Sequence, residues 1–108
     1  MKILKDRSEF DSAIQSDKNL CALFTAEWCP DCHVLKPVMP ELEKEFSDTF
    51  DFISVDRDQF LDLCQEQDIF GIPSFLCFRA GKETGRFVSR DAKTREEIES
   101  FLRTVKES

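Results

Sequence analysis

One segment constrains the fold of this chain more than any other: a buried-strand pattern that runs directly into Trp28-Cys29-Pro30-Asp31-Cys32. Residues 20–26 are apolar on both alternating faces, as in a strand that is covered on both sides. Pro30 follows Cys29, and proline is favoured at the first position of a helix. Apolar residues then recur at helical spacing as far as Phe46. Cys29 is therefore predicted at the junction of a buried strand and a helix N-terminus.

The two cysteines of this segment are spaced for reversible disulfide formation. Cys29 and Cys32 are separated by two residues, so they can close a small ring. The unpaired N–H groups and the positive dipole end of the helix favour a thiolate at Cys29, which lowers its pKa. Lower basicity also weakens the nucleophile, so most of the rate is expected from placement and from Cys29 being a good leaving group when Cys32 attacks it. One sulfur should be accessible, with the other beneath it. The pattern predicts thiol–disulfide exchange.

Composition and charge exclude several classes of protein. A chain of 108 residues predicts one domain spanning 1–108. The net charge is −7 and the basic residues form no block, so neither nucleic acid nor a membrane surface is expected as a partner. No apolar run has membrane-spanning length, and residues 1–5 lack the hydrophobic stretch of a signal peptide. Five cysteines, an odd number, suit a reducing compartment and predict a cytoplasmic protein.

The remaining periodicities predict an alternation of strands and helices. The expected elements are a strand at 2–4, a helix capped by Ser8, a strand at 20–26, a helix over 30–46 kinked at Pro37, a strand at 50–55, a helix at 59–67, strands at 74–79 and 84–89, and a final helix that opens with a capping box of Thr94 and Glu97. The last two strands are expected to form an antiparallel hairpin through 80–83. The order βαβαβαββα predicts an α/β fold with a central mixed sheet flanked by helices on both faces.

Several motifs give the chain, over essentially its whole length, a resemblance to the thioredoxin superfamily. The matching features are Ala26-Glu27-Trp28-Cys29-Pro30-Asp31-Cys32, Pro37, Asp56, Gly71-Ile72-Pro73-Ser74 and Phe78-Arg79-Ala80-Gly81. The resemblance implies the thioredoxin fold and thiol–disulfide oxidoreductase activity, with Cys29 as attacking thiol and Cys32 as resolving thiol. It also implies a cis Ile72–Pro73 bond facing the disulfide, although X–Pro bonds in general favour trans. In the family, the backbone of the residue before this proline pairs with the substrate chain. Trp28, directly before the attacking cysteine, is expected to shield the disulfide and contact substrate.

The chain departs from the family pattern in the core next to the cysteines. Leu23 and Phe52 stand where thioredoxins have a buried aspartate, thought to help deprotonate the resolving thiol, and its lysine neighbour. One interpretation is simply a drier core, since packed apolar groups often replace a buried ion pair without loss of stability. The other is that Cys32 uses a different proton acceptor, with water, Glu27 or Asp31 as candidates.

Two further departures lie near the expected site. Asp31 stands where thioredoxins have proline; its charge complements the helix dipole but opposes thiolate formation at Cys29. We therefore expect a higher pKa for Cys29 than in strongly oxidising CPHC proteins, and a reducing protein. WCPDC is also the motif of a branch of small thioredoxin-related proteins, so substrate choice can differ from that of thioredoxin. The usual glycine of the loop after the last strand is replaced within Val88-Ser89-Arg90, whose side chains are expected to exclude bulky protein disulfides.

Two cofactor patterns compete with this interpretation. Residues 29–33 match the CxxCH pattern of haem c attachment, but Met39 is too close to His33 on one helix to be the opposite ligand. A zinc site would need two more ligands, and Cys64 and Cys77 are separated by a short helix and the Pro73 turn. No metal is therefore expected. Cys21 and Cys77 are predicted in the core, Cys64 on the buried face of its helix, and His33 on the solvent face.

These patterns together predict a cytoplasmic, monomeric disulfide reductase whose only redox group is the Cys29–Cys32 disulfide. Its expected substrates are proteins or small molecules that contain disulfides. The sequence has no flavin or nucleotide motif, so an external donor, an NADPH-dependent thioredoxin reductase, is expected to recycle it. Two alternatives stay open: a specialised redox partner of one enzyme or one small disulfide, and a binding module that keeps the fold with little turnover.

Overall fold

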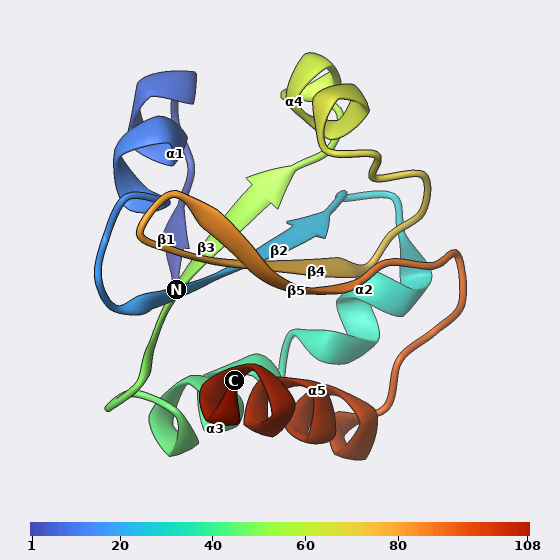
Figure 1. The fold of residues 1–108 in the computed structure, drawn as a ribbon. Helices are drawn as coiled ribbons and strands as arrows, with labels where there is room; N and C mark the ends of the chain where they lie inside the picture. The colour runs from blue at the N-terminus through green and yellow to red at the C-terminus, as the bar shows by residue number, and fades with distance from the viewer.

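The computed structural model describes residues 1–108 and is organised around one five-stranded mixed sheet (Figure 1). The strands are β1 (Lys2–Ile3), β2 (Asn19–Thr25), β3 (Phe50–Asp56), β4 (Ser74–Arg79) and β5 (Lys82–Phe87), in the order β1-β3-β2-β4-β5. Strands β1, β3 and β2 are parallel, whereas β4 is antiparallel to β2, and β5 to β4. The helices are α1 (Arg7–Ala13), α2 (Pro30–Leu35), α3 (Met39–Glu45), α4 (Leu61–Glu66) and α5 (Arg95–Glu107). This is the mixed, two-sided α/β arrangement that the sequence predicts.

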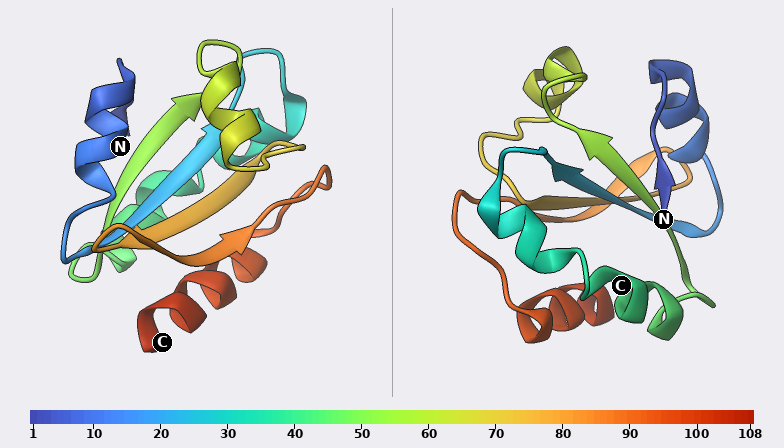
Figure 2. Two further views of the ribbon diagram at one scale, coloured as in Figure 1. Left: turned by 45° about the horizontal axis from the view of Figure 1, so that its top comes forward. Right: turned by 180° about the vertical axis from the view of Figure 1, so that it is seen from behind.

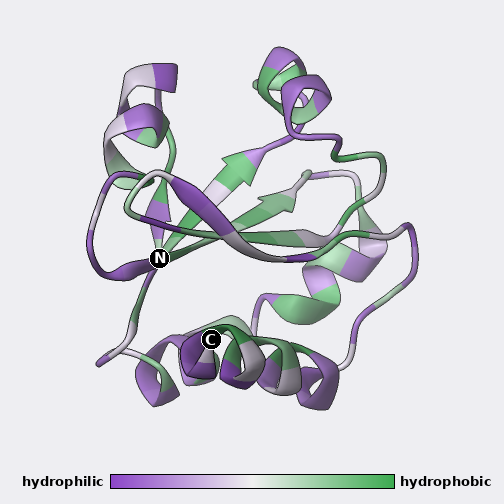
Figure 3. Ribbon diagram, in the orientation of Figure 1, coloured by the Kyte–Doolittle hydropathy of each residue, from purple (hydrophilic) through white to green (hydrophobic).

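The alternation of apolar residues divides the core into two layers, one on each face of the sheet. In β2, Cys21 and Leu23 pack with α2, α3 and α5, whereas Leu20, Ala22 and Phe24 pack with α1 and α4. Figure 2 shows α1 and α4 on one face of the sheet and α2, α3 and α5 on the other. The hydrophobic colour of β2 and β4 in Figure 3 reflects this double coverage. No helix is long and apolar enough to cross a membrane.

The predicted helix over 30–46 is two helices. Pro37 has no N–H to donate and its ring crowds the preceding turn, so the chain leaves the α-helix after Leu35 and resumes at Met39. Between them the N–H of Val38 bonds the carbonyl of Leu35 over 3.0 Å, in a tighter turn. The prediction of one kinked helix was therefore wrong in its continuity, although the break falls at the expected proline.

Other boundaries also differ from the prediction: α4 spans Leu61–Glu66 rather than 59–67, and β5 ends at Phe87 rather than at 89. Asp6, not Ser8, caps α1: its carboxylate accepts from the N–H of Glu9 at 3.0 Å, and the Glu9 carboxylate accepts from the N–H of Asp6 at 3.2 Å. The hairpin between β4 and β5 has a two-residue loop, with Ala80 at φ 51° and Gly81 at φ 81°. These positive φ angles match a type I′ turn, so β5 begins at residue 82 rather than 84.

The strand directions bring four loops to one edge of the sheet. The parallel strands β2 and β3 end at this edge, β4 starts there, and β5 ends there. The segments that follow β2, β3 and β5 therefore meet the segment that precedes β4. These are the Trp-Cys-Pro-Asp-Cys segment, residues 57–58, residues 88–93 and residues 70–73.

Candidate active site

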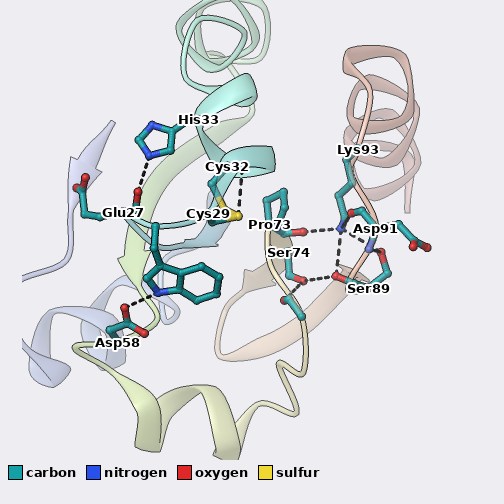
Figure 4. Close-up of a disulfide and its surroundings, with 12 residues drawn as sticks. Glu27, Cys29, Cys32, His33, Asp58, Pro73, Ser74, Ser89, Asp91 and Lys93 are labelled. Carbon is teal, nitrogen blue, oxygen red and sulfur yellow. Dashed lines mark hydrogen bonds between the residues drawn. A yellow bond between two sulfur atoms is a disulfide. The ribbon is translucent and has the colours of Figure 1, made fainter.

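The two cysteines lie at the N-terminus of α2 and are joined as a pair. Their sulfurs are 2.50 Å apart and their Cα atoms 5.2 Å apart (Figure 4). Cys29 is the N-cap residue, and its Sγ accepts a hydrogen bond from the N–H of Cys32 over 3.2 Å. Pro30 occupies the first turn, where its missing N–H costs nothing. A thiolate at Cys29 would accept this same N–H and face the positive end of the helix.

The two sulfurs border different spaces. Each cysteine is 4% exposed in the paired state, so the expected difference in accessibility is absent from this state. Cys29 lines an open groove of about 360 Å³ together with Trp28, Pro30, Asp31 and Ile72. Cys32 lines a separate cavity of about 240 Å³ on the other side. The two thiols therefore differ in that Cys29 borders the open groove and Cys32 borders the separate cavity.

The cavity beside Cys32 contains polar groups that the sequence patterns did not indicate. Leu23, at the position of the family's buried aspartate, forms part of its wall, together with Thr25, Ser54, Lys36 and Glu43. Phe52, at the position of the family's lysine, is 8% exposed in the hydrophobic core. Asp31, one of the predicted proton acceptors, lines the groove of Cys29 instead, and Glu27 is exposed. The cavity has a mixed apolar and polar lining and is large enough to hold water beside Cys32.

Trp28 lines the groove and is held in place by the two residues that follow β3. Its ring is 59% exposed, and its indole N–H donates to a carboxylate oxygen of Asp58 over 2.7 Å. The Arg57 guanidinium lies 5.8 Å from the centre of the ring, within cation–π range. The indole is therefore oriented before any substrate arrives.

Replacing Asp58 by alanine should release Trp28 from this orientation. We expect kcat/KM for a protein disulfide to fall about fivefold, and the free energy of unfolding to fall by about 1 to 2 kcal/mol, since the hydrogen bond from Trp28 and the exposed ion pair with Arg57 are both lost. Fluorescence of the only tryptophan reports its environment, and steady-state kinetics report the activity. Asp48→Ala, at an exposed position without hydrogen bonds, is the control. Unchanged fluorescence and kinetics in Asp58→Ala would contradict the role assigned to this contact.

The segment before β4 faces the cysteine pair with an unpaired backbone. The Ile72–Pro73 bond is cis, as the resemblance implied, and Ile72 packs against Cys29 and Cys32. Neither the N–H nor the carbonyl of Ile72 makes a hydrogen bond within the protein. The Ser74 hydroxyl donates to the carbonyl of Gly71 over 2.6 Å and so fixes the turn. The backbone of Ile72 is therefore free to pair with another chain at the edge of the groove.

A buried lysine behind this segment was missed by the sequence analysis. Lys93 is 5% exposed, and its ammonium donates to the carbonyls of Pro73 and Asp91 and to the hydroxyl of Ser89 (Figure 4). It also lies 5.0 Å from the centre of the Phe87 ring. Burial lowers its pKa, opposed by the charges of nearby carboxylates, including Asp31. In the sequence, a lysine before a helix cap looks like a solvated loop residue.

Comparison with known proteins agrees with this geometry. The sequence profile of the thioredoxin family matches residues 2–104. The chain belongs to the thioredoxin family. Among structures of this fold, the chain superposes on oxidised mitochondrial thioredoxin 3 of Saccharomyces cerevisiae with a TM-score of 0.83 at 21% identity, covering 95% of this chain and 93% of that one. For oxidised thioredoxin of Plasmodium falciparum the TM-score is 0.81 at 25% identity, with 95% of both chains covered.

Thioredoxins with curated names are similar in sequence as well. Mitochondrial thioredoxin-2 of Schizosaccharomyces pombe is 34% identical over 80% of this chain and 64% of its own length. The H-type thioredoxin of Picea mariana is 38% identical over 76% of this chain and 65% of its own. Thioredoxin-1 of Saccharomyces cerevisiae is 34% identical over 78% of this chain and 81% of its own. The chain thus spans slightly less than two thirds of the first two relatives. Family and cysteine pair together support a thiol–disulfide oxidoreductase.

The other cysteines of this thioredoxin-family chain lie in the core. Cys21 and Cys77 face each other across β2 and β4, both are fully buried, and burial raises the pKa of Cys21. Cys64 is buried on α4, where burial likewise raises its pKa. These positions confirm the predicted core placement. Cys64 and Cys77 belong to core layers on opposite faces of the sheet, so they do not complete a zinc site with the active pair.

The two residues considered as haem ligands lie in different environments. His33 is on the solvent face of α2, as predicted, and its ring contacts the carbonyl oxygen of Glu27. Met39 is 3% exposed in the hydrophobic core. A buried core methionine and an exposed histidine do not form an axial pair around one iron.

Proposed function

We propose that the protein reduces disulfide bonds by exchange at Cys29 and Cys32. The observation that carries this proposal is the cysteine pair at a helix N-terminus, beside the unpaired backbone of Ile72. The Cys29 thiolate attacks one substrate sulfur, the substrate S–S bond breaks, and a substrate thiolate leaves. The Cys32 thiolate then attacks the Cys29 sulfur, closing the protein disulfide and releasing the second substrate thiolate. Two electrons pass from protein to substrate, and the two product thiolates each take a proton.

The groove is proposed as the substrate site. Trp28 lines it from the cysteine segment, and Ile72, which precedes Pro73, lines it from the segment before β4, so the substrate chain passes over Cys29 between them. The free N–H and carbonyl of Ile72 support antiparallel pairing with an extended substrate segment. Pro30 and Asp31 border the attacking sulfur, and Glu27 anchors His33 beside them through its carbonyl.

The proton of Cys32 is proposed to pass to water in the cavity beside it. In this cavity Leu23 takes the place of the family's buried carboxylate, and Thr25, Ser54 and the charged groups of Lys36 and Glu43 surround the remaining space. Hydroxyl and charged groups hold water there and exchange protons with it. Resolution by Cys32 then depends on solvent rather than on a dedicated buried base.

The remaining parts of the proposal concern partners and location. We place the reaction in a reducing compartment, the cytoplasm, because an odd number of cysteines includes three that are buried and unpaired. The names of the relatives include mitochondrial and chloroplastic thioredoxins, so this assignment rests on the cysteines alone. The protein is proposed to act as a monomeric single domain, with no cofactor beyond its disulfide, and to be recycled by a thioredoxin reductase that draws on NADPH.

Removing the charge of Asp31 should make Cys29 more reactive. Asp31 and Cys29 line the same groove, and a nearby negative charge disfavours the thiolate. In Asp31→Asn we expect the rate of iodoacetamide alkylation of Cys29 at pH 6 to rise about threefold, in a Cys32→Ser background. Asp48→Asn in the same background is the control for net charge. An alkylation profile identical to that of the parent would show that Asp31 does not tune Cys29.

A disulfide reduction assay separates the proposed function from its alternatives. Insulin is incubated with the protein, a thioredoxin reductase and NADPH, and NADPH oxidation is followed. Turnover of insulin supports the general reductase. Selective turnover of one small disulfide, with insulin untouched, supports a specialised partner. A reversible Cys29–Cys32 bond with no turnover of either substrate would favour a binding module and overturn the proposal.

A further inference from the structure

The groove beside Cys29 contains two arginines, although the protein as a whole is acidic. The chain has a net charge of −7, yet two of the residues that line the groove are arginines, Arg57 and Arg90. Asp31 is the only carboxylate among its lining residues. An arginine without an internal partner beside a reactive sulfur offers a binding site for an anionic group of the substrate.

The strand order sets the two arginines on either side of the cysteine. Arg57 follows β3 and Arg90 follows β5, and in the sheet these strands flank β2 and β4, from which the cysteine segment and Ile72 project. Arg57 is already engaged: its guanidinium lies 3.1 Å from a carboxylate oxygen of Asp58 and against the Trp28 ring. Part of its charge is therefore compensated within the protein.

Arg90, by contrast, has a free guanidinium on a fixed backbone. It is exposed and forms no hydrogen bond or ion pair with the rest of the chain. Its neighbours on both sides are tied to the Lys93 ammonium, which bonds the Ser89 hydroxyl and the Asp91 carbonyl over 3.1 Å each. The stem of Arg90 packs on Gly71: a Cβ built there would lie 2.7 Å from Arg90 Cγ and 2.5 Å from the Ser89 carbonyl oxygen. Glycine is required for this approach.

We propose that this groove selects disulfide substrates in which an acidic residue lies beside the attacked cysteine, and that Arg90 binds its carboxylate. The inference rests on the proposed function and names its substrate class: an extended acidic segment of another protein. Such a segment, paired to the backbone of Ile72, runs past the loop that carries Arg90. A guanidinium offers a carboxylate two parallel N–H donors, so the contact fixes register as well as charge. The exposed rings of Trp28 and Phe70 then contact apolar residues of the substrate next to its cysteine.

The test uses the reduced protein and three disulfide-linked peptide dimers that differ only beside the cysteine, with glutamate, glutamine or lysine there. Mixing each with the protein in a stopped-flow instrument gives a second-order rate constant for oxidation, followed by Trp28 fluorescence, with no reductase needed. We expect the ratio of the glutamate to the lysine rate constant to fall about fivefold in Arg90→Gln. At 1 M salt, where the screening length is about 3 Å, the wild-type ratio should approach that of the variant.

Arg103→Gln is the matched control, because it makes the same change in net charge at an exposed position on α5. An unchanged ratio in this control supports the proposal, whereas an equal fall in both variants would show that only net charge acts. Equal ratios in wild type and Arg90→Gln would overturn the inference while leaving disulfide exchange intact. Failure of every peptide to oxidise the wild-type protein would instead overturn the proposed function. Oxidised glutathione forms a further arm: Arg90 dependence with it alone would assign the site to a small acid.

Discussion

Replacing Cys29 by serine is expected to abolish disulfide reduction, whereas replacing Cys32 by serine should stop the reaction after its first step. Cys29 borders the groove and Cys32 borders the opposite cavity, so only Cys29 meets the substrate sulfur. Without Cys32 the mixed disulfide has no intramolecular thiol to resolve it, and resolution by external thiols loses an effective molarity of many orders of magnitude. We expect insulin turnover to fall at least about a thousandfold in both variants.

The two variants differ in what they accumulate, and this difference identifies the attacking thiol. Cys32→Ser should retain a covalent substrate adduct on Cys29, detected as a mass increase that a reductant removes, and Cys29→Ser should retain none. Cys64→Ser is the control for loss of a thiol, because Cys64 is buried on the far side of the sheet in α4. Its activity should stay within about twofold of wild type. An adduct on Cys32 in the Cys29→Ser protein, or continued turnover in Cys32→Ser, would reverse or remove the assigned roles.

The sheet and its two covered faces could be predicted because they depend on local periodicity. Strand β2 has apolar residues on both faces, and this pattern alone requires helices on both sides. The helix start at Pro30 follows from proline chemistry, and the capping box of Thr94 and Glu97 is present as predicted. The cis bond before Pro73 was implied only by resemblance, since the general preference of X–Pro bonds points the other way.

The errors of prediction fall where two local signals compete. Ser8 and Asp6 both suit an N-cap, and the deciding feature is that Glu9 stands three residues after Asp6. At Pro37 the apolar periodicity continues while the backbone cannot, and the backbone decides. At the hairpin, Ala80 adopts a positive φ angle next to Gly81. This conformation is uncommon for alanine, so the sequence did not indicate it.

The parts of the site that are contiguous in sequence could be predicted, whereas the residues that only the fold brings together could not. Residues 27–32 and 72–73 are found by motif, since each motif is contiguous in sequence. The loop of Arg90 was placed near the site by resemblance, whereas Lys93 reaches the site through the fold, when the end of β5 returns beside the start of β4. Nothing in the sequence indicates that the Arg90 guanidinium lacks a partner within the protein, or distinguishes Lys93 from a solvated lysine. Likewise, the polar lining opposite Cys32 comes from β2, β3 and α3 together. Such convergence appears only once the strand order is known.

Lys93→Met is expected to cost about 2 to 3 kcal/mol of the free energy of unfolding. Methionine keeps most of the apolar stem but removes the ammonium beside the Phe87 ring and leaves the carbonyls of Pro73 and Asp91 without their buried donor. The loop of residues 88–92 then loses its tie to the segment before β4. We therefore also expect a rise in KM of about threefold to tenfold for the glutamate peptide disulfide, with kcat little changed, because the cysteine pair itself is untouched. Chemical denaturation and steady-state kinetics measure the two effects.

Lys106→Met provides the comparison, since Lys106 is exposed in the last turn of α5 and has no hydrogen bond or ion pair through its side chain. Its stability should change by less than about 0.5 kcal/mol and its KM not at all. A loss of stability in Lys93→Met with an unaltered KM would make Lys93 a purely structural anchor. Equal stability of the two methionine variants would mean that the hydrogen bonds of the Lys93 ammonium contribute nothing beyond those that water supplies. A rise in KM for the glutamate peptide that exceeds the rise for the lysine peptide would tie Lys93 to the charge recognition proposed for Arg90, the arginine of the groove that has no partner within the protein.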